Sequence, residues 1–480
     1  MVLKRIACLL VLGLISVSFC IKDSFCDDYQ QVAGLIDLRT SYSDGAHDLD
    51  FLVELAKERG FDVLFINDHD RMVLEYGIFP FRNIFRKREE LPSVNSRGAD
   101  KYLQNIAEIT RKYPDMIVIP GSESAPFYYW TGSYFKGNLT AHNWERHLLV
   151  IGMDNPEDYR NLPVLHNGFS TRYLRQLLPG SIIFLIPLFF SMYLIIRGNY
   201  RILGIVILVF SSFMLIEYHP FKSSPFDQYH GDQGYLPYQE LIDYVRDRGG
   251  TTFWTHPEAG AGVNARKGPI TVKTPKHSEA LLITKGYTGF ATIYGTGIKN
   301  TEPGKEWDRV LFDYCRGNRD TPAWGISTAD FHEEGGAGEK LGNFPTIFLV
   351  KEKTREEVLS ALKQGRMYAC RSGDNFQRFV LEDFSIFDSK TDNQAVMGQT
   401  IELNNKPEIK IKVSSSDQEA YNVNVRIIRS GKLIKTLSKT TPFVVDFKDD
   451  YFNPGEVIYY RLDIPGKLVS NPIFVKFSRE

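Results

Sequence analysis

The chain carries almost no net charge. It has 57 basic and 58 acidic residues among 480, which gives a formal charge of −1. It therefore lacks the basic excess with which proteins bind the phosphate backbone of nucleic acid, and we do not expect nucleic acid as its principal partner. Low-complexity linkers and internal repeats are also absent from the sequence. The length leaves ample material for a large core and suggests about three domains.

Cysteine is scarce as well, with 5 residues in the whole chain. One of them, Cys8, falls within an export signal that is described next. In an oxidising compartment the remaining four can pair in three ways, and the sequence does not choose among them. These four are Cys20, Cys26, Cys315 and Cys370.

The N-terminal residues 1–20 have the pattern of an export signal. Lys4 and Arg5 form a short basic region, an apolar run follows, and Ser16 and Ser18 are spaced as a cleavage site requires. A lipoprotein signal fits poorly, because Phe19 stands before Cys20 where such a signal has a small residue. We therefore expect a signal peptide or an N-terminal anchor.

Long uncharged apolar runs occur in the middle of the chain, at 181–196 and 202–216. They are separated by a short turn that contains Arg197 and Arg201. We predict a transmembrane helical hairpin over residues 179–218; the alternative is a pair of buried core helices. The two arginines favour a cytoplasmic turn, so both flanking parts of the chain are expected on the extracytoplasmic, periplasmic side of the cell membrane.

Polar side chains follow two predicted buried strands near the N-terminus. Residues 34–38 and 63–66 read as strands, and residues 49–59 have apolar positions at helical spacing and stop at Gly60. This βαβ unit places acidic, imidazole and guanidinium groups at the C-terminal ends of its strands, where α/β proteins carry out their chemistry. The groups are Asp37, Arg39, Asp44, Asp68 and His69.

These motifs resemble those of the polymerase and histidinol phosphatase (PHP) family. The family's first motif, His-x-His-Thr-x-x-Ser-Asp-Gly, is matched from Thr40 to Gly45, with Asp37 and Arg39 in place of the two histidines. Further matches follow in family order over residues 34–365. They are Asp68-His69, Ile-Pro-Gly-Ser-Glu123, His147, Thr-His256-Pro and a final Asp330-Phe-His332 that follows a predicted strand at 324–327.

The resemblance implies a distorted (β/α)7 barrel whose C-terminal face holds up to three divalent metals. In this chain the barrel would be made of residues 28–178 and 219–372, interrupted by the membrane hairpin. Imidazole nitrogens mixed with carboxylate oxygens suit Zn, Mn or Fe, and we expect one or two ions with Glu123 as the bridge. The implied ligands are Asp44, His69, Glu123, His147, His256, Asp330 and His332, with Asp37 as a further oxygen donor.

Arginine at position 39 cannot ligate a metal, because its guanidinium stays protonated. We expect Arg39 to replace one cation and to hold a substrate phosphate through its planar fork. Asp68 is expected to assist catalysis as a partner of other groups rather than as a ligand.

Short alternating strands separated by turn residues predict a small β-sandwich over residues 379–480. It contains no metal or nucleophile motif, so we expect a packing or recognition module.

The function that these features predict is hydrolysis of a phosphomonoester or phosphodiester by metal-activated water, outside the cytoplasm and at a membrane. Two alternatives stay open: a catalytically degenerate sensor or scaffold that keeps the fold, and a metal-dependent amidohydrolase-like enzyme. The aromatic segments 79–88 and 126–135 form the mouth of the pocket, rest on the membrane, or pack as ordinary loops. The expected substrate is a phosphate-bearing small molecule or a membrane-linked phosphoester.

Overall fold

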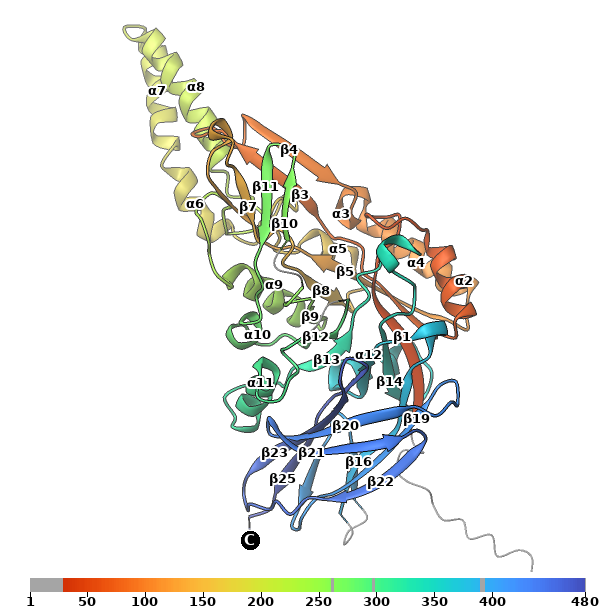
Figure 1. Cartoon of the computed structure of the whole chain (residues 1–480). Coiled ribbons are helices and arrows are strands. Elements are labelled where there is room, and N and C mark those ends of the chain that lie inside the picture. The colour runs from red at the N-terminus through yellow and green to blue at the C-terminus, as the bar shows by residue number, and fades with distance from the viewer. Residues whose placement is uncertain (1–28, 260–262, 296–297, 389–392, 480) are drawn as a thin grey trace, which may run out of the picture.

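The computed structural model describes residues 29–259, 263–295, 298–388 and 393–479. The predicted export signal and Cys8, Cys20 and Cys26 lie outside these residues. Within them, Cys315 and Cys370 are free thiols. The protein is a mixed α/β molecule with a large mixed sheet, a helical hairpin at one end and a strand-rich C-terminal region at the other (Figure 1).

Seven strands at one end of the large sheet organise the first part of the fold. Their order is β13-β12-β9-β8-β5-β2-β1. One group of parallel strands consists of β1, β2 and β5, and a second consists of β9, β12 and β13. Between them lies β8, which runs antiparallel to its neighbours β5 and β9. The sheet is therefore mixed rather than the all-parallel sheet of a regular (β/α)7 barrel. The bounds are β1 Gln30–Leu38, β2 Val63–Ile66, β5 Ile117–Ser124, β8 Leu148–Ile151, β9 Thr251–Trp254, β12 Gly289–Ile293 and β13 Trp324–Ser327.

The two outer strands of this set meet at their C-terminal ends. The amide of Ala329, just after β13, donates to Ile36 O at 3.0 Å, and Arg39 N donates to Phe331 O at 3.0 Å. The N-terminal part of β1 instead pairs antiparallel with β14, Pro345–Val350. The end of β1 and the segment after β13 are thus held side by side although nearly 300 residues separate them.

Helices with one apolar face pack that face against this sheet. In α2 (Leu49–Glu58) the Asp48 carboxylate caps the N-terminus by accepting from Phe51 N at 2.9 Å, and Gly60, with φ 74°, follows the C-terminus. The face that α2 buries consists of Leu52, Val53 and Ala56. The other helices are α3 Val94–Arg97, α4 Ala99–Lys112, α5 Pro156–Arg160, α9 Leu236–Arg246, α10 Ala280–Ile283, α11 Glu306–Cys315 and α12 Arg355–Gln364.

Two smaller sheets extend beyond the seven strands. A ribbon is formed by β3 (Met72–Gly77) and β4 (Arg86–Leu91). The second sheet has the order β10-β11-β7-β6 and joins segments that are more than 100 residues apart. Its bounds are β6 Tyr129–Thr131, β7 Thr140–His142, β10 Val263–Lys267 and β11 Ile270–Thr274.

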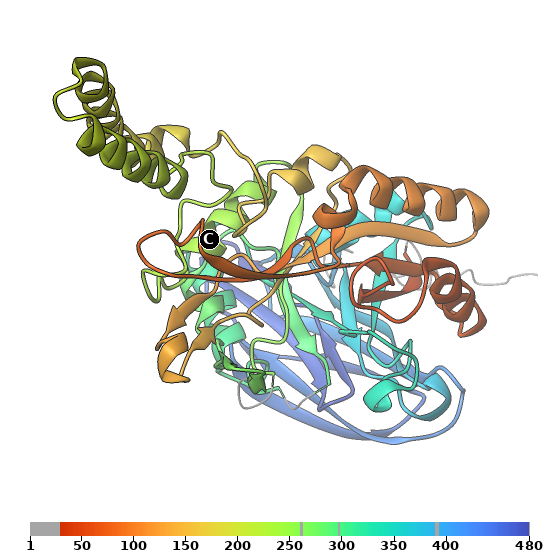
Figure 2. The ribbon, with the colours of Figure 1, turned by 90° about the horizontal axis from the view of Figure 1, so that it is seen from above.

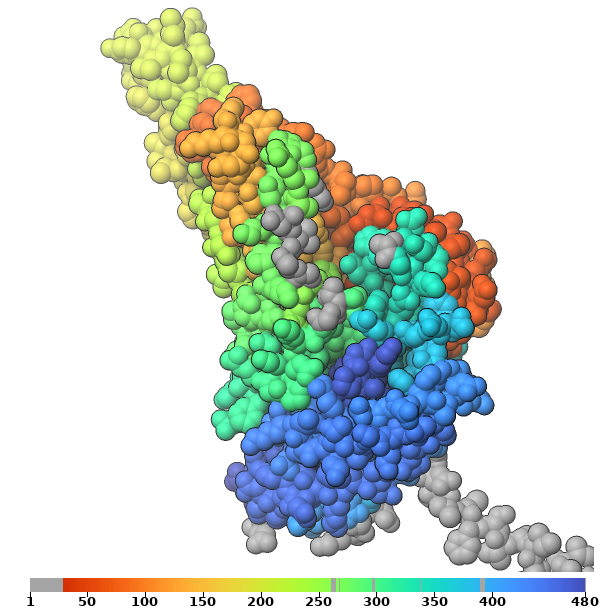
Figure 3. Space-filling model, in the orientation of Figure 1, coloured from red at the N-terminus to blue at the C-terminus, as the bar shows by residue number. Residues whose placement is uncertain are grey.

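An apolar helical hairpin projects from the rest of the molecule (Figures 1, 2 and 3). It consists of α6 (Leu174–Ile182), α7 (Leu185–Arg197) and α8 (Arg201–Glu217). Among the described residues one helix, α6 together with α7, is long and apolar enough to cross a membrane. At Gly204 of α8 a Cβ would lie only 2.9 Å from Ser191 O of α7, so the two helices pack closely through small residues.

The outward surface of the hairpin consists of large apolar side chains. Ile196 is 84% exposed and Ile202 is 81% exposed. A buried pair of core helices would not leave such residues in contact with solvent. The structure therefore contradicts the core-helix alternative, whereas insertion into a membrane stays a proposal.

The C-terminal strands lie in two sheets. One has the order β17-β16-β19-β22, and the other continues the large sheet through β15, β24, β23, β20 and β21. In this second sheet β25 pairs with β23, and β18 pairs with β25. Because β15 pairs with β24, hydrogen bonds cross the expected boundary between barrel and sandwich. The bounds are β15 Met367–Cys370, β16 Phe379–Phe387, β17 Gln394–Val396, β18 Thr400–Leu403, β19 Glu408–Ser415, β20 Asn422–Arg429, β21 Lys432–Thr440, β22 Phe443–Lys448, β23 Val457–Ile464, β24 Leu468–Ser470 and β25 Ile473–Phe477.

A buried ion pair also joins the C-terminal strands to α11. Arg461 of β23 donates through Nε and Nη2 to the two carboxylate oxygens of Asp308, both at 2.8 Å. Tyr459 donates its hydroxyl to the same carboxylate at 2.8 Å, and Trp307 lies 4.8 Å from the guanidinium. Both charged side chains are almost fully buried, so neither can exchange its partner for water.

Replacing Asp308 with alanine should lower the free energy of unfolding by about 3–5 kcal/mol, because it leaves the buried Arg461 charge with only the more distant carboxylate of Asp463, at 3.7 Å. Urea unfolding of the purified chain, followed by tryptophan fluorescence, measures this change. The matched control is Lys406→Ala, which removes an exposed ion pair with Asp450 and should cost less than about 1 kcal/mol. Equal effects of the two substitutions would contradict the role of the buried pair.

Candidate metal centre

Acidic and imidazole side chains from both halves of the chain converge at one edge of the seven strands. Glu123 is the last residue but one of β5, and His256 follows the end of β9. His147 precedes β8, and because β8 runs antiparallel, its beginning lies at the same edge as the ends of its neighbours. One cavity of about 530 Å³ is lined by seven of the expected site residues: Asp44, His69, Glu123, His147, His256, Asp330 and His332.

Glu123 lies at the centre of this cluster. Its Oε1 is 3.1 Å from Nδ1 of His147 and 3.7 Å from Nε2 of His256. Its Oε2 is 3.3 Å from Nδ1 of His69 and also contacts the guanidinium of Arg39. The two carboxylate oxygens therefore face different sets of partners, as a bridging ligand requires.

The donor atoms around Glu123 are suited to a cation. One ligand atom each from Glu123, His147 and His256 lie within 4.8 Å of one another. Glu123 Oε1 and both ring nitrogens of His147 are buried and have no hydrogen-bond partner among the described residues. Buried polar atoms are nearly always satisfied, so Glu123 Oε1 and Nδ1 of His147, with Nε2 of His256 3.7 Å from the same oxygen, fit a divalent ion. Two imidazoles and a carboxylate suit Zn, Mn or Fe.

A second pair of histidines shares the carboxylate of Asp44. Asp44 Oδ2 is 3.3 Å from Nε2 of His69 and 3.6 Å from Nε2 of His332. Although burial would raise the pKa of Asp44, hydrogen bonds from these two imidazoles hold it far below its usual range. The bond with Asp44 raises the pKa of His332 to about 9. His69 precedes the hairpin in sequence and His332 follows it, so the structure brings together residues from the two sides of the interruption.

Electrostatics around Glu123 favour its ionised form. Burial alone would raise the pKa of this carboxyl, but Arg39 and His147 hold it well below its usual range. Burial would lower the pKa of His147, yet the adjacent Glu123 raises it to about 9. The pKa of His256 is raised by its bond to the same carboxylate, again against the effect of burial. A cation that binds these imidazoles must displace their protons.

Arg39 occupies a second position at which carboxylates converge. Oxygens of Asp37, Glu123 and Asp330 lie within 4.8 Å of one another. The guanidinium of Arg39 contacts all three, with Nη1 2.5 Å from Asp37 Oδ1 and Nη2 3.4 Å from Asp330 Oδ1. A fixed positive charge therefore stands where three carboxylates would otherwise hold a metal ion. This geometry is what the expected replacement of one cation by Arg39 requires.

The other expectation for Arg39, that it binds a substrate phosphate, does not fit its position. Its side chain is fully buried, it does not line the cavity, and its Nη1 also donates to Asn67 O at 2.8 Å. Both Nη atoms of Arg39 already contact oxygens of the protein. Arg39 thus acts on the cluster from behind Glu123 rather than on a ligand in the cavity.

Asp68 is likewise turned away from the cavity. Its carboxylate accepts from Thr40 N at 2.9 Å, from the Thr40 hydroxyl at 2.7 Å and from the Ser43 hydroxyl at 2.6 Å. These bonds fix the loop that carries Asp44. Asp68 therefore has the contacts of a positioning residue, as expected for a partner rather than a ligand, and a direct catalytic role for it stays a prediction.

The backbone is strained at three of the site residues. Asp37 has φ 75°, His256 has φ 30° and Asp330 has φ 46°. Residues other than glycine rarely adopt this left-handed region, and such residues gather at functional sites. At Asp37 the register of β1 against β2 also shifts between Leu35 and Leu38, as a bulge does beside an active site.

Several residues at the centre were not identified from the sequence. The Asn67 side chain accepts from Asp37 N at 3.1 Å and its carbonyl accepts from Arg39. Glu339 accepts from His332 N at 2.9 Å, and Glu145 lies 3.9 Å from Nε2 of His147. Asn67 and Glu145 stand close in sequence to identified motifs, which was a usable signal. Glu339 lies in a glycine-rich loop without one.

The two aromatic segments separate into different environments. In segment 79–88, Phe81 packs on Phe210 and Phe213 of α8, with ring centroids 5.9 and 5.3 Å apart. In segment 126–135 the first residues are buried, whereas Phe135 is 79% exposed. None of these aromatic residues lines the metal cavity itself, whereas Trp130 and Tyr134 line a second cavity that shares Met72 and Leu91 with it.

Comparison with known proteins gives limited guidance. No family model and no curated protein matches the chain. A two-domain protein from Bacteroides vulgatus, which contains a predicted PHP-like metal-dependent phosphoesterase, is 11% identical over 94% of this chain and 96% of its own, with a TM-score of 0.37. A proposed metal-dependent phosphoesterase from Bifidobacterium adolescentis is 15% identical over 68% of this chain and 96% of its own, with a TM-score of 0.31. Likeness at this level does not assign a family.

Loading the protein with Mn²⁺ or Zn²⁺ should stabilise it, by about 2.7 kcal/mol at a hundredfold excess over Kd. His147→Ala removes one donor from the Glu123 cluster and should weaken metal binding at least about tenfold. Isothermal titration calorimetry measures the affinity and stoichiometry. His230→Ala, at a largely exposed histidine away from the cavity, is the matched control and should bind as the parent does. Unchanged binding by the His147 variant would contradict this site.

Removing the Arg39 charge should create a second cation site. In Arg39→Met the three carboxylates of Asp37, Glu123 and Asp330 face one another, so the metal-free protein should lose about 3–5 kcal/mol of stability. One additional divalent ion per chain should then bind and restore it, as measured by elemental analysis and thermal unfolding. Arg39→Lys keeps the charge and should bind no additional ion. Equal metal content in all three proteins would show that Arg39 does not replace a cation.

Proposed function

We propose that this protein is a membrane-anchored, metal-dependent phosphoesterase of the PHP type that hydrolyses a phosphoester with an apolar portion. The observation that carries the proposal is the Glu123 cluster, in which unsatisfied buried donors from separate strands face one cavity. The resemblance of the sequence motifs to PHP proteins supports the same reaction class.

The hydrogen bonds between the end of β1 and the segment after β13 support a closed, distorted arrangement of the seven strands. In such an arrangement the C-terminal ends of the strands surround one site, as in the barrels that the PHP resemblance implies. The antiparallel β8 contributes to the distortion.

A divalent ion held by Glu123, His147 and His256 would supply hydroxide near neutral pH and neutralise charge on a phosphoryl group. The chain's own residues prepare this chemistry. Arg39 keeps Glu123 ionised, and Asp44 holds the imidazoles of His69 and His332 at the cavity wall. The other ring nitrogen of each imidazole also faces a protein oxygen, with Nδ1 of His69 3.3 Å from Glu123 Oε2 and Nδ1 of His332 2.8 Å from Asp330 O, so these contacts fix the orientation of both rings.

The proposed position at a membrane rests on the exposed apolar hairpin. The Ser181 hydroxyl near the start of the hairpin donates to Tyr218 O at its end, and Phe184 stacks on Tyr218 with centroids 5.2 Å apart. A chain that leaves and returns at one point crosses a membrane an even number of times. Both halves of the site then share one compartment, and the arginines in the turn favour the extracytoplasmic side.

An apolar groove supports a substrate with a hydrocarbon portion. A second cavity of about 460 Å³ adjoins the metal cavity, and Met72 and Leu91 line both. The groove is continued by Leu74, Trp130 and Ile270. It runs along the β3–β4 ribbon, whose far end packs on α8. A phosphoester group at the metals and an apolar chain in the groove match a membrane-linked phosphoester.

The experiment is a hydrolysis assay with the full chain in detergent and added Mn²⁺ or Zn²⁺. Phosphomonoesters and phosphodiesters are each supplied with and without an alkyl chain. We expect release of product, faster with the alkyl chain, and at least about a 100-fold loss in Glu123→Gln, because this residue contacts every part of the cluster. Leu74→Gln places a polar group in the groove and should remove the preference for the alkyl substrates without removing activity on the others.

Uniform inactivity of a folded, metal-loaded protein would overturn the phosphoesterase proposal and favour the sensor or scaffold. Activity that is confined to amides would favour the amidohydrolase-like alternative. His230→Ala serves again as the control and should retain full activity.

A further inference from the structure

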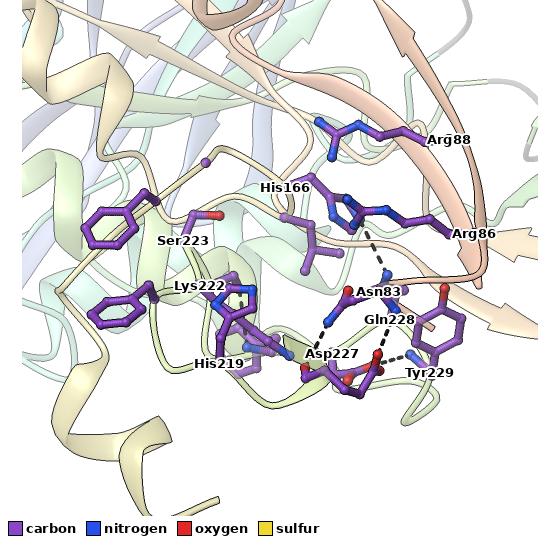
Figure 4. Close-up of a pocket in the computed structure, with 17 residues that line it drawn as sticks. Asn83, Arg86, Arg88, His166, His219, Lys222, Ser223, Asp227, Gln228 and Tyr229 are labelled. Carbon is purple, nitrogen blue, oxygen red and sulfur yellow. Dashed lines mark hydrogen bonds between the residues drawn. The ribbon is translucent and has the colours of Figure 1, made fainter. Parts of the chain in front are cut away.

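A polar cavity of about 410 Å³ lies at the base of the helical hairpin, apart from the metal centre (Figure 4). Its walls come from the β3–β4 ribbon and from the segments that enter and leave the hairpin. No residue lines both this cavity and the metal cavity. The function proposed above leaves it without a role.

Three cationic side chains line the cavity. Arg86 and Arg88 reach it from β4, and Lys222 reaches it from the segment after α8 (Figure 4). Arg86 and Arg88 share the buried carboxylate of Glu75, at 2.9 and 3.5 Å from their Nη1 atoms. In the described part of the chain no carboxylate lies within 4.0 Å of the Lys222 ammonium. Among the described residues this lysine therefore has no direct ion-pair partner.

The acidic side chains in the wall are engaged by the backbone. Glu217 accepts from Asn83 N at 2.6 Å, and Asp227 accepts from Tyr229 N at 2.7 Å. These bonds satisfy part of each carboxylate and fix the loops that form the wall. They leave Arg86 and Lys222 as the cationic groups with donors available to a ligand, because Arg88 also donates through Nε and Nη2 to Glu90, at 3.3 and 3.0 Å.

Two histidines in the wall also experience a positive environment. Burial, and then Arg88 and Arg86, lower the pKa of His166 to about 3. The pKa of His219 is also lowered, mainly by burial and further by the charges of Lys222 and Arg86. Both imidazoles are therefore neutral at physiological pH and add hydrogen-bonding groups without adding charge. His166 itself has φ 63°, a strained backbone at the floor of the cavity.

The position of the cavity relates it to the hairpin. Glu217, the last residue of α8, is part of its wall, and the exposed ring of Phe169 lies at its edge. Phe79, at the tip of the ribbon, is 73% exposed. Aromatic rings at the end of apolar helices mark the level at which hydrocarbon gives way to headgroups. The anion found at that level in a bilayer is a lipid phosphate.

We propose that this cavity is a phosphate-binding site in which Arg86 and Lys222 hold the headgroup of an anionic phospholipid. Arg86 and Lys222 reach the cavity from different walls, β4 and the segment after α8, so they can contact different oxygens of one phosphate. The assignment of the phosphate to a lipid headgroup rests on the membrane position proposed above. The binding of a phosphate in this cavity does not depend on that position. Free phosphate offers the same chemistry and is the second source to be tested.

The test uses native mass spectrometry of the full chain in detergent, titrated with phosphatidylglycerol, phosphatidylcholine or inorganic phosphate. We expect one phosphatidylglycerol per chain to bind in preference to phosphatidylcholine. Lys222→Gln should weaken this binding at least about tenfold, since a hydrogen bond to a charged group is lost. Lys222→Arg keeps the charge and should bind as the parent does.

The matched control is Lys87→Gln on the same strand, β4. Lys87 lines the apolar groove instead of this cavity, so the substitution removes an equal charge outside the cavity. It should change phosphatidylglycerol binding less than about twofold. His147→Ala, which impairs the metal centre, should leave the binding unchanged, so failure of the enzymatic proposal and failure of this one give different results.

Competition by inorganic phosphate at concentrations similar to those of the lipid would identify free phosphate as the ligand. Absence of competition together with saturable lipid binding identifies the headgroup. The proposal is overturned if neither ligand binds, if Lys87→Gln weakens binding as much as Lys222→Gln does, or if His147→Ala abolishes it.

Discussion

The ionised carboxylate of Glu123 is the group on which the rest of the site depends. It is almost fully buried, so it is stable only with positive charge and hydrogen-bond donors around it. One oxygen faces His147 and His256, and the other faces His69 and Arg39. β5 lies between β2 and β8 in the sheet, so Glu123 can be reached from both sides. The convergence of residues that are distant in sequence follows from this central position.

The helical hairpin interrupts the sequence without interrupting the sheet. Its two ends meet at Tyr218, so the strands before and after it pack as if they were contiguous. The β3–β4 ribbon then connects the hairpin with the metal cavity, because Met72 and Leu91 lie at one end and the loop carrying Phe81 lies at the other. Six residues of extended chain span about 20 Å. A metal centre, an apolar groove and a cationic cavity thus lie along one short ribbon.

Much of the fold could be predicted from the sequence because its elements have strong local signals. The strands at 63–66 and 324–327 have the predicted bounds, and the helix predicted over 49–59 ends one residue earlier. The antiparallel direction of β8 could not be predicted, because hydrophobic periodicity does not indicate whether a strand runs parallel or antiparallel to its neighbours. Nor could the sheet that pairs β7 with β11, because its register depends on contacts across 130 residues of chain.

The candidate site shows the same division. Family-like motifs identified the residues that line the metal cavity, including His69 and His332. They did not reveal where the Arg39 guanidinium goes, since its position depends on carboxylates supplied by three separate segments. We therefore expect Glu123 to be shared by the Arg39 guanidinium and one bound cation. Burial, which local sequence does not encode, argues against a phosphate-binding Arg39, and the replacement of a metal ion by Arg39 stays a prediction.

The most direct measurement of this account is anomalous X-ray scattering from crystals of the protein loaded with Mn²⁺ or Zn²⁺. A single strong peak within bonding distance of Glu123, His147 and His256, with Arg39 still in contact with Glu123, is the predicted result. A peak at the position of the Arg39 guanidinium, or no peak beside Glu123, would contradict it.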